Sequence, residues 1–344
     1  MDISWWAKAS EAISEAIIEA MEIRKIEGFA CFSWGELRYA AAHGCLGGKA
    51  DNESKLDLWL HMNEMSLQED REQTDVVRVG QGDGTYYMLR KNRWPHRSQW
   101  RATNIALMSI IKHDLAFLDD PAGEKDGQGL IALPRESMRI GWKRYMLPGP
   151  MLANITYQQY SNAVKLLREA DSIIGEMREA EEKQDTAAMI GLAVRMKQAM
   201  ARAVSHLLTP RSLRVTNRAG GAVRMDVKWE YAYDPEVAER NVDYIARHAP
   251  KELYSILSLH LQSCLVEYRR QYPDMFSGGD KDDDRMPFIA EADSVNAVMK
   301  WQSYGTQQEV YDSNAVFIFS ILSAMAKESK EMEKLNSKTR GKRV

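Results

Sequence analysis

The chain of 344 residues exceeds the size at which one hydrophobic core usually stops growing, so its length predicts two domains. Hydrophobic residues account for 44% and charged residues for 28%, the balance of a globular protein with a substantial buried core. The formal net charge of -3 excludes binding to nucleic acid through the overall charge, so any such role requires a local basic surface.

Cysteine usage and apolar patterning indicate a cellular location. Cys31, Cys45 and Cys264 are too few and too scattered for a disulfide framework, which is typical of a reducing compartment. Acidic residues interrupt the first 25 residues, so they predict an amphipathic helix and no signal peptide. The most apolar run, residues 315–326, is too short to span a membrane. We therefore expect a cytoplasmic protein with no membrane partner.

Residues 1–120 predict a small α+β domain. An apolar stripe indicates a first helix around residues 13–21, and the short apolar run at residues 29–32 predicts a strand. A helix is expected next, from Glu36 to Cys45, where a glycine pair ends it.

The second half of this domain carries a hairpin signal. Val77 and Val79 alternate with polar residues, the glycine-rich turn at residues 80–84 follows, and Tyr87 and Leu89 resume the alternation. The tight turn accounts for these glycines, which lack the spacing of a phosphate-binding loop. Apolar residues at helical spacing then predict a helix over residues 98–117.

A linker, a larger domain and a tail complete the predicted organisation. Residues 121–133 form the linker, and the polar, glycine-rich stretch at residues 119–129 is its strongest signal. Residues 134–335 predict a mainly helical, bundle-like domain with one β-hairpin near residues 211–233. Residues 336–344 form a tail with only positive charges. The fold class is therefore α+β and predominantly helical.

Two helices of the larger domain are predicted to form an antiparallel hairpin, with Thr156 and Asp185 as their N-caps. In the second helix, Met189, Met196 and Met200 share one face with apolar neighbours. Methionine faces also serve as adaptable binding surfaces, but at helical spacing core packing is the preferred interpretation.

After this hairpin the apolar period changes from 3.6 to 2. The strand over residues 223–233 is predicted to be half exposed, with Trp229 and Tyr231 on one face. Helices are expected over residues 235–248, 251–272 and 295–301. A last helix over residues 310–335 is apolar on every side in its middle, so we expect it to be central to the core.

No motif predicts catalysis or a cofactor. Asp280, Asp282, Asp284 and Glu291 match the calcium-ligand spacing of an EF-hand loop. However, Arg285 stands where the sharp turn needs glycine, so we favour a solvated acidic loop.

The sequence also gives little support for a zinc site or for a catalytic nucleophile. Cys31, His43 and Cys45 lack a nearby fourth zinc ligand, with His61 a remote candidate, and buried structural cysteines are favoured. No local signature of a catalytic nucleophile is present. A site assembled only in three dimensions stays open.

A basic and aromatic segment, residues 90–101, is the strongest binding candidate in the first domain. Its cations and tryptophans suit a protein partner or the phosphates and bases of a nucleic acid, although an ordinary anchored loop is the commoner meaning. The candidate contact residues are Arg90, Arg93, Trp94, Arg97, Trp100 and Arg101, together with Trp229 and Tyr231.

Several short phrases in the larger domain carry a family resemblance. They are residues 139–150 (RIGWKRYMLPGP), 151–160 (MLANITYQQY), 248–250 (HAP), 272–276 (YPDMF) and 299–311 (MKWQSYGTQQEVY). Over about residues 135–335 this order resembles tail-assembly proteins of tailed phages and prophages. In that group an aromatic-Gly-Thr turn introduces a closing helix, which corresponds to residues 312–335.

The resemblance implies a non-enzymatic role in virion morphogenesis, as a tail-assembly chaperone-like protein or a minor tail component. The implied partners are phage tail proteins such as a tape-measure or tube protein, and the implied location is the host cytoplasm or the virion. No family catalytic residues transfer to this chain. A nucleic-acid-binding accessory protein that uses residues 90–101 and the basic tail is the alternative.

Overall fold

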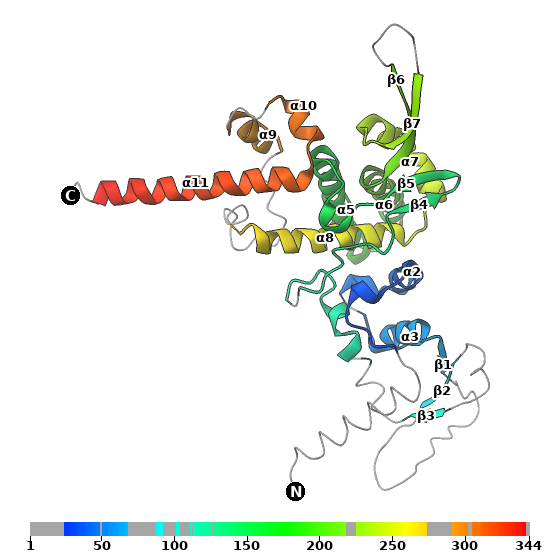
Figure 1. The fold of residues 1–344 in the computed structure, drawn as a ribbon. Helices are drawn as coiled ribbons and strands as arrows, with labels where there is room; N and C mark the ends of the chain where they lie inside the picture. Colours follow the sequence, from blue (N-terminus) through cyan, green and yellow to red (C-terminus); the bar gives the residue numbers. More distant parts are fainter. Residues whose placement is uncertain are drawn as a thin grey trace. The chain divides into compact units, whose positions relative to one another are not determined.

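The computed structural model describes residues 24–48, 50–67, 87–91, 101–103, 111, 113–125, 127–217, 225–273, 291–301 and 305–341 (Figure 1). The chain divides into two compact units, residues 1–129 and 130–344, and this division falls in the segment predicted as a linker. The described chain is predominantly helical with small antiparallel sheets, as the sequence predicted.

The first unit begins with a turn where a strand was predicted. Phe29–Cys31 forms the 3-10 helix η1, because the rings of Phe29, Phe32 and Phe117 pack edge to face with centroids 4.9–5.8 Å apart. This triangular packing requires a curved backbone, so the strand prediction is wrong.

Two capped helices follow. Helix α2 (Trp34–Ala42) has a capping box in which Ser33 and Glu36 bind each other's backbone N–H groups, and it ends before Cys45. The short 3-10 helix η2 (Cys45–Gly47) separates it from α3 (Asn52–Met62), which the sequence analysis did not predict.

A three-stranded antiparallel sheet completes the first unit, with the order β1 (Met65–Leu67), β2 (Tyr87–Lys91), β3 (Arg101–Thr103). Tyr87 and Leu89 lie in a strand as predicted, whereas residues 77–84 and the first predicted helix lie outside the described residues.

The helix predicted over residues 98–117 is wrong at both ends. Pairing of Leu89 with Arg101 draws the segment around Arg101 into the sheet as β3. At the other end, Ala116–Asp119 forms the 3-10 helix η4. The local spacing of apolar residues predicted a helix here, but pairing with the distant strand β2 makes residues 101–103 a strand.

The second unit is built on a helical hairpin of α5 (Tyr157–Glu182) and α6 (Thr186–Leu207). Both predicted caps are confirmed, since Thr156 accepts from the N–H of Gln159 and Asp185 accepts from that of Ala188. Helices α7 (Pro235–His248) and α8 (Leu253–Gln271) also agree with the prediction.

The closing helix is interrupted. Helix α9 (Glu291–Lys300) precedes α10 (Gln307–Asp312) and α11 (Ala315–Gly341), so the single helix predicted over residues 310–335 is two. Ser313 is the C-cap of α10, and Asn314 caps α11 and lies beside Thr156 in an antiparallel bridge. Ile318 and Phe319 are buried as predicted, but Phe317 is 48% exposed.

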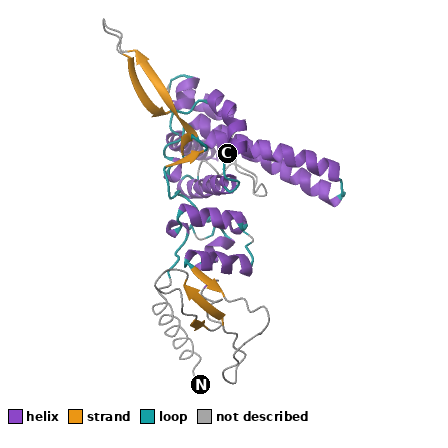
Figure 2. Cartoon of the chain, turned by 90° about the vertical axis from the view of Figure 1, so that its right-hand side faces the viewer, coloured by secondary structure: helices purple, strands orange, loops and turns teal. Residues whose placement is uncertain are grey.

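A four-stranded antiparallel sheet lies in the second unit, with the order β4 (Ser137–Ile140), β5 (Lys143–Met146), β6 (Thr209–Asn217), β7 (Met225–Tyr231). The β6–β7 hairpin was predicted near residues 211–233, and it extends beyond the helices (Figure 2). The β4–β5 hairpin was not predicted. It turns at Gly141, whose φ of 56° favours glycine.

The described helices include none that is long and apolar enough to cross a membrane.

Candidate functional site

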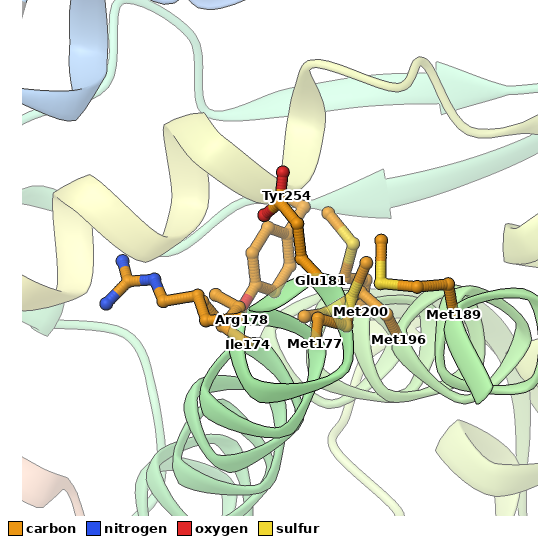
Figure 3. Close-up of a pocket in the computed structure, with 8 residues that line it drawn as sticks. All are labelled: Ile174, Met177, Arg178, Glu181, Met189, Met196, Met200 and Tyr254. Atoms are coloured by element: carbon orange, nitrogen blue, oxygen red, sulfur yellow. The ribbon is translucent and has the colours of Figure 1, made fainter. Parts of the chain in front are cut away.

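An open groove of about 330 Å³ lies along the α5–α6 hairpin (Figure 3). It is lined by residues from α5, α6 and the first turn of α8: Ile174, Met177, Arg178, Glu181, Met189, Met196, Met200 and Tyr254. The methionine side chains of both helices gather around the ring of Tyr254.

Helical spacing positions the groove wall on α6. Met189, Met196 and Met200 are separated by steps of seven and four residues, which places them along one face. They are half-buried, and Met189 and Met196 pack against a buried cluster to which α6 contributes Leu192 and Ala199. The stripe therefore packs against the core, as preferred from sequence, and also lines an open surface.

The opposite wall comes from α5, where Ile174 and Met177 face the groove one turn apart and Arg178 and Glu181 form a charged rim. Behind this wall the buried residues are small or branched, and Ala170 and Ala180 allow the two helices to approach closely. Because α5 and α6 pack closely and long methionine side chains line the surface between them, the groove is an apolar channel.

The groove is suited to binding apolar groups. Unbranched methionine side chains adapt to irregular ligands, and a cavity of this size is at the lower end of those that hold small ligands. Burial raises the pKa of the Tyr254 hydroxyl to about 12, so this group stays neutral at physiological pH.

Further apolar side chains of the hairpin are exposed outside the groove lining. Ile174 at the groove is 36% exposed, and Ile190 and Val194, one turn apart on α6, are 65% and 57% exposed. Large aliphatic side chains of one helical hairpin are thus concentrated on its solvent-facing surfaces.

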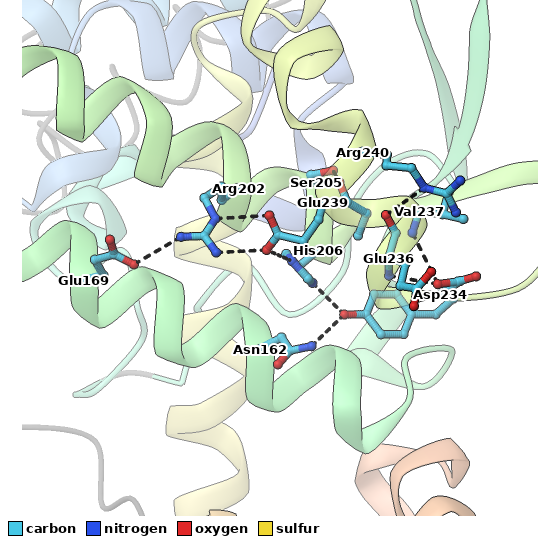
Figure 4. A network of polar contacts seen from close by, with 12 residues as sticks. Asn162, Glu169, Arg202, Ser205, His206, Asp234, Glu236, Val237, Glu239 and Arg240 are labelled. Atoms are coloured by element: carbon cyan, nitrogen blue, oxygen red, sulfur yellow. Dashed lines mark hydrogen bonds and ion pairs between the residues drawn. The ribbon is translucent and has the colours of Figure 1, made fainter.

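A polar network connects α5, α6 and α7 at the other end of the hairpin (Figure 4). The carboxylate of Glu239 accepts from Arg202 at 3.0 Å and faces His206 Nε2 at 3.0 Å. His206 Nδ1 lies 2.6 Å from the hydroxyl of Tyr233, which also accepts from the Asn162 amide at 2.9 Å.

The electrostatics of this network favour a structural role. Burial lowers the pKa of His206, which is 3% exposed. The hydrogen bond from Arg202 lowers the pKa of Glu239. A neutral His206 that donates to Glu239 and accepts from Tyr233 has a hydrogen-bond partner for each of its two ring nitrogens. The network therefore stabilises the packing of α5, α6 and α7.

The predicted basic and aromatic segment joins two neighbouring strands. Arg90 lies in β2 and Arg101 in β3, the strand that pairs with it. The remaining candidates of this segment lie outside the described residues: Arg93, Trp94, Arg97 and Trp100. In the other sheet, β7 places Trp229 opposite Leu213 and Tyr231 opposite Arg211.

The metal candidates are not brought together. Asp280, Asp282 and Asp284 lie outside the described residues, and Glu291 is the first residue of α9. No cluster of metal-ligating side chains occurs among the residues that the structure describes.

The Cys31, His43 and Cys45 set has an alternative explanation. Burial raises the pKa of the Cys45 thiol to about 11, which keeps it protonated. The rings of His43 and His61 each stack on Tyr39 with centroids 4.0 Å apart. Aromatic packing therefore accounts for both histidines.

Sequence reasoning found the methionine stripe but missed Ile174, Met177 and Tyr254. The apolar spacing of residues 174 and 177 is visible on α5, but the contact with α8 depends on the tertiary fold.

Comparison of the chain with known protein families, with characterised proteins and with solved structures found no match.

Proposed function

We propose that this chain is a non-enzymatic assembly protein that holds an apolar segment of a phage tail protein, such as a tape-measure protein, in the groove between α5 and α6. The observation that carries the proposal is the groove itself, an apolar channel lined by four methionines together with Ile174 and Tyr254. Methionine-rich grooves accept amphipathic helices without demanding one fixed side-chain pattern.

The charged rim supports a helical client. Arg178 and Glu181 are spaced three residues apart on α5, so they offer both signs of charge beside the apolar channel. A helix whose apolar stripe enters the groove would place its own polar flanks next to these residues, which excludes water from the contact without burying an unpaired charge.

The resemblance to tail-assembly proteins supports the same class of function. One of the phrases that carry it, residues 151–160, forms a junction with the segment between α10 and α11. The N–H of Tyr157 donates to the carbonyl of Ser313 at 2.8 Å, and the N–H of Ala315 donates to that of Ile155 at 3.0 Å. The phrase at residues 151–160 therefore contributes to one structural junction of the unit that contains the groove.

Site-specific photocrosslinking tests the proposal. A benzoylphenylalanine residue is introduced at Ile174, on the groove, or at Met332, a 54% exposed position on α11, in cells that express the native gene neighbours. We expect a light-dependent adduct with a tape-measure or tube protein from position 174 and none from position 332.

A groove substitution supplies the second arm. Met196→Lys places a charge in the apolar channel and should reduce co-purification of the client about tenfold, because burying one large apolar side chain contributes about 1.5–3 kcal/mol. Met332→Lys is the matched control and should leave co-purification unchanged. Equal adducts from both crosslinking positions, or no tail protein in any adduct, would exclude the groove as the client site.

A further inference from the structure

The strands of the second sheet are strongly basic in a chain that is acidic overall. Its four strands together contain six Arg and Lys residues and two Asp and Glu residues. The whole chain has a formal net charge of -3, so positive charge is concentrated on this sheet.

Strand register arranges part of this charge in a row. Arg139 of β4 pairs with Arg144 of β5. The β5–β6 pairing, in which Tyr145 is opposite Pro210, brings Arg144 beside Arg211, and Arg211 pairs with Tyr231 of β7. We call Arg139, Arg144, Arg211 and Tyr231 the arginine row.

The arginine row lies on the solvent side of the sheet. Its three arginines are exposed and Tyr231 is half-buried, whereas Met138, Ile140 and Tyr145 on the opposite side are buried. Successive residues of a strand point to opposite faces, so the sheet buries its apolar side and presents the row to solvent.

Like charges in adjacent register positions destabilise a sheet, and strands lie only about 4.8 Å apart. Within the described part of the chain, Arg139 and Arg144 form no ion pair with a carboxylate that would offset this repulsion. A ligand with evenly spaced negative charges would relieve it, and guanidinium groups bind phosphate through paired hydrogen bonds.

The width of the sheet selects among nucleic acids. Four strands at about 4.8 Å spacing span about 14 Å, more than the roughly 12 Å of a duplex major groove, so the row cannot enter that groove. A single strand has accessible bases, which stack on aromatic side chains. Tyr231 ends the row, and Trp142, at the turn between Arg139 and Arg144, is 80% exposed.

We propose that the arginine row binds single-stranded nucleic acid, with phosphates on Arg139, Arg144 and Arg211 and a base stacked on Tyr231. This site is separate from the methionine groove and differs from the basic segment at residues 90–101. This second proposal therefore does not depend on the proposed assembly function.

Fluorescence anisotropy with a labelled oligo-dT of about 20 nucleotides tests the site on the full chain. Three phosphate contacts on a single strand predict a salt slope of about -2, so affinity should fall about twentyfold between about 50 and 200 mM salt. Arg139→Glu with Arg144→Glu should weaken binding at least about tenfold and flatten the slope, while Arg139→Lys with Arg144→Lys should retain most of the affinity.

Two matched double variants locate the effect. Lys165→Glu with Lys197→Glu reverses two exposed charges on α5 and α6, and Arg93→Glu with Arg97→Glu reverses two in the segment predicted from sequence. Both should bind like the wild type. Tyr231→Ala should weaken binding at least about fivefold, and Tyr231→Phe, which keeps the ring, should not.

Four outcomes would overturn the proposal. They are absence of binding at low salt, equal losses in the sheet and control variants, tighter binding to a duplex of the same length, and complete competition by polyglutamate at equal charge concentration. Circular dichroism of each variant confirms that a loss of binding does not come from a loss of fold.

Discussion

His206 and His260 are two buried imidazoles in the second unit. His206 is 3% exposed between Tyr233 and Glu239, and His260 is fully buried with Nδ1 2.8 Å from the carbonyl of Leu130. Burial lowers the pKa of both side chains. Each is therefore neutral in the folded protein at a pH where an exposed histidine has begun to bind a proton.

This pKa difference predicts the direction of the pH dependence of stability. The unfolded chain protonates each histidine near pH 6.5, whereas the folded chain does so only at lower pH. The free energy of unfolding should be insensitive to these groups above about pH 6.5. Below it, stability should fall by up to about 1.4 kcal/mol per pH unit for each histidine.

Urea unfolding at about pH 7.5, 6.0 and 5.0 measures this slope, in a window above the ordinary pKa of carboxylates. His206→Gln retains a donor for Glu239 and an acceptor for Tyr233, and it should remove the contribution of one proton. His113→Gln, at a side chain that is 90% exposed, is the matched control for the substitution itself. Identical slopes in His206→Gln and the wild type would show that His206 does not titrate differently on folding.

At the scale of elements, Asn314 fixes the start of α11. Its side-chain oxygen accepts from the N–H of Val316 at 2.9 Å, and its amide donates to the carbonyl of Ala153 at 2.7 Å. One side chain thus caps α11 and ties it to the segment that precedes α5.

Removal of this side chain should be costly. Asn314→Ala should lower the free energy of unfolding by about 1–2 kcal/mol, because loss of a helix N-cap alone costs about 1 kcal/mol. Asn314→Ser keeps a capping oxygen without placing a second acceptor against the carbonyl of Ala153, so it should cost less. Urea midpoints compare the three proteins, and an unchanged midpoint in Asn314→Ala would contradict the capping role.

The same residue illustrates what could be predicted from the sequence. Thr156, Asp185 and Pro235 precede clear helical patterns, so the starts of α5, α6 and α7 were predictable. Asp312, Ser313 and Asn314 are three consecutive polar residues before the apolar run that begins at Ala315, and each is a residue type that caps helices. The sequence therefore contained a signal for the break, but helical spacing on both sides of it favoured one helix, so α10 and α11 were predicted as one.

The methionine groove and the arginine row were harder to predict than the helix boundaries. The methionine stripe is a local pattern, so the sequence revealed it, but Tyr254 joins the groove from a different helix. The arginine row needs Arg139, Arg144 and Arg211 to align across strands far apart in sequence. Pairing register between distant strands depends on the tertiary fold, and composition alone shows only that the segments are basic.

At the scale of the whole molecule, Leu130 begins the second compact unit and is part of its core. It is 1% exposed, its N–H donates to the hydroxyl of Ser263 at 2.9 Å, and its carbonyl faces His260. These contacts show that the last residues of the predicted linker stabilise the second unit. We therefore expect the stability of an isolated unit to depend on where the linker is cut.

Two fragments test this dependence. Residues 127–344 should fold alone with a helical circular dichroism spectrum, because the unit has its own core. Residues 135–344 lack Leu130, which removes one hydrogen bond each from Ser263 and His260 and one buried side chain from the core. Burial of such a side chain contributes about 1.5–3 kcal/mol and each hydrogen bond about 0.5–1.5 kcal/mol, so the midpoint of thermal unfolding should fall by at least about 4 °C. Equal midpoints for the two fragments would mean that the contacts of Leu130 contribute nothing to the unit, and aggregation of the longer fragment would show that residues 1–126 are required for it to fold.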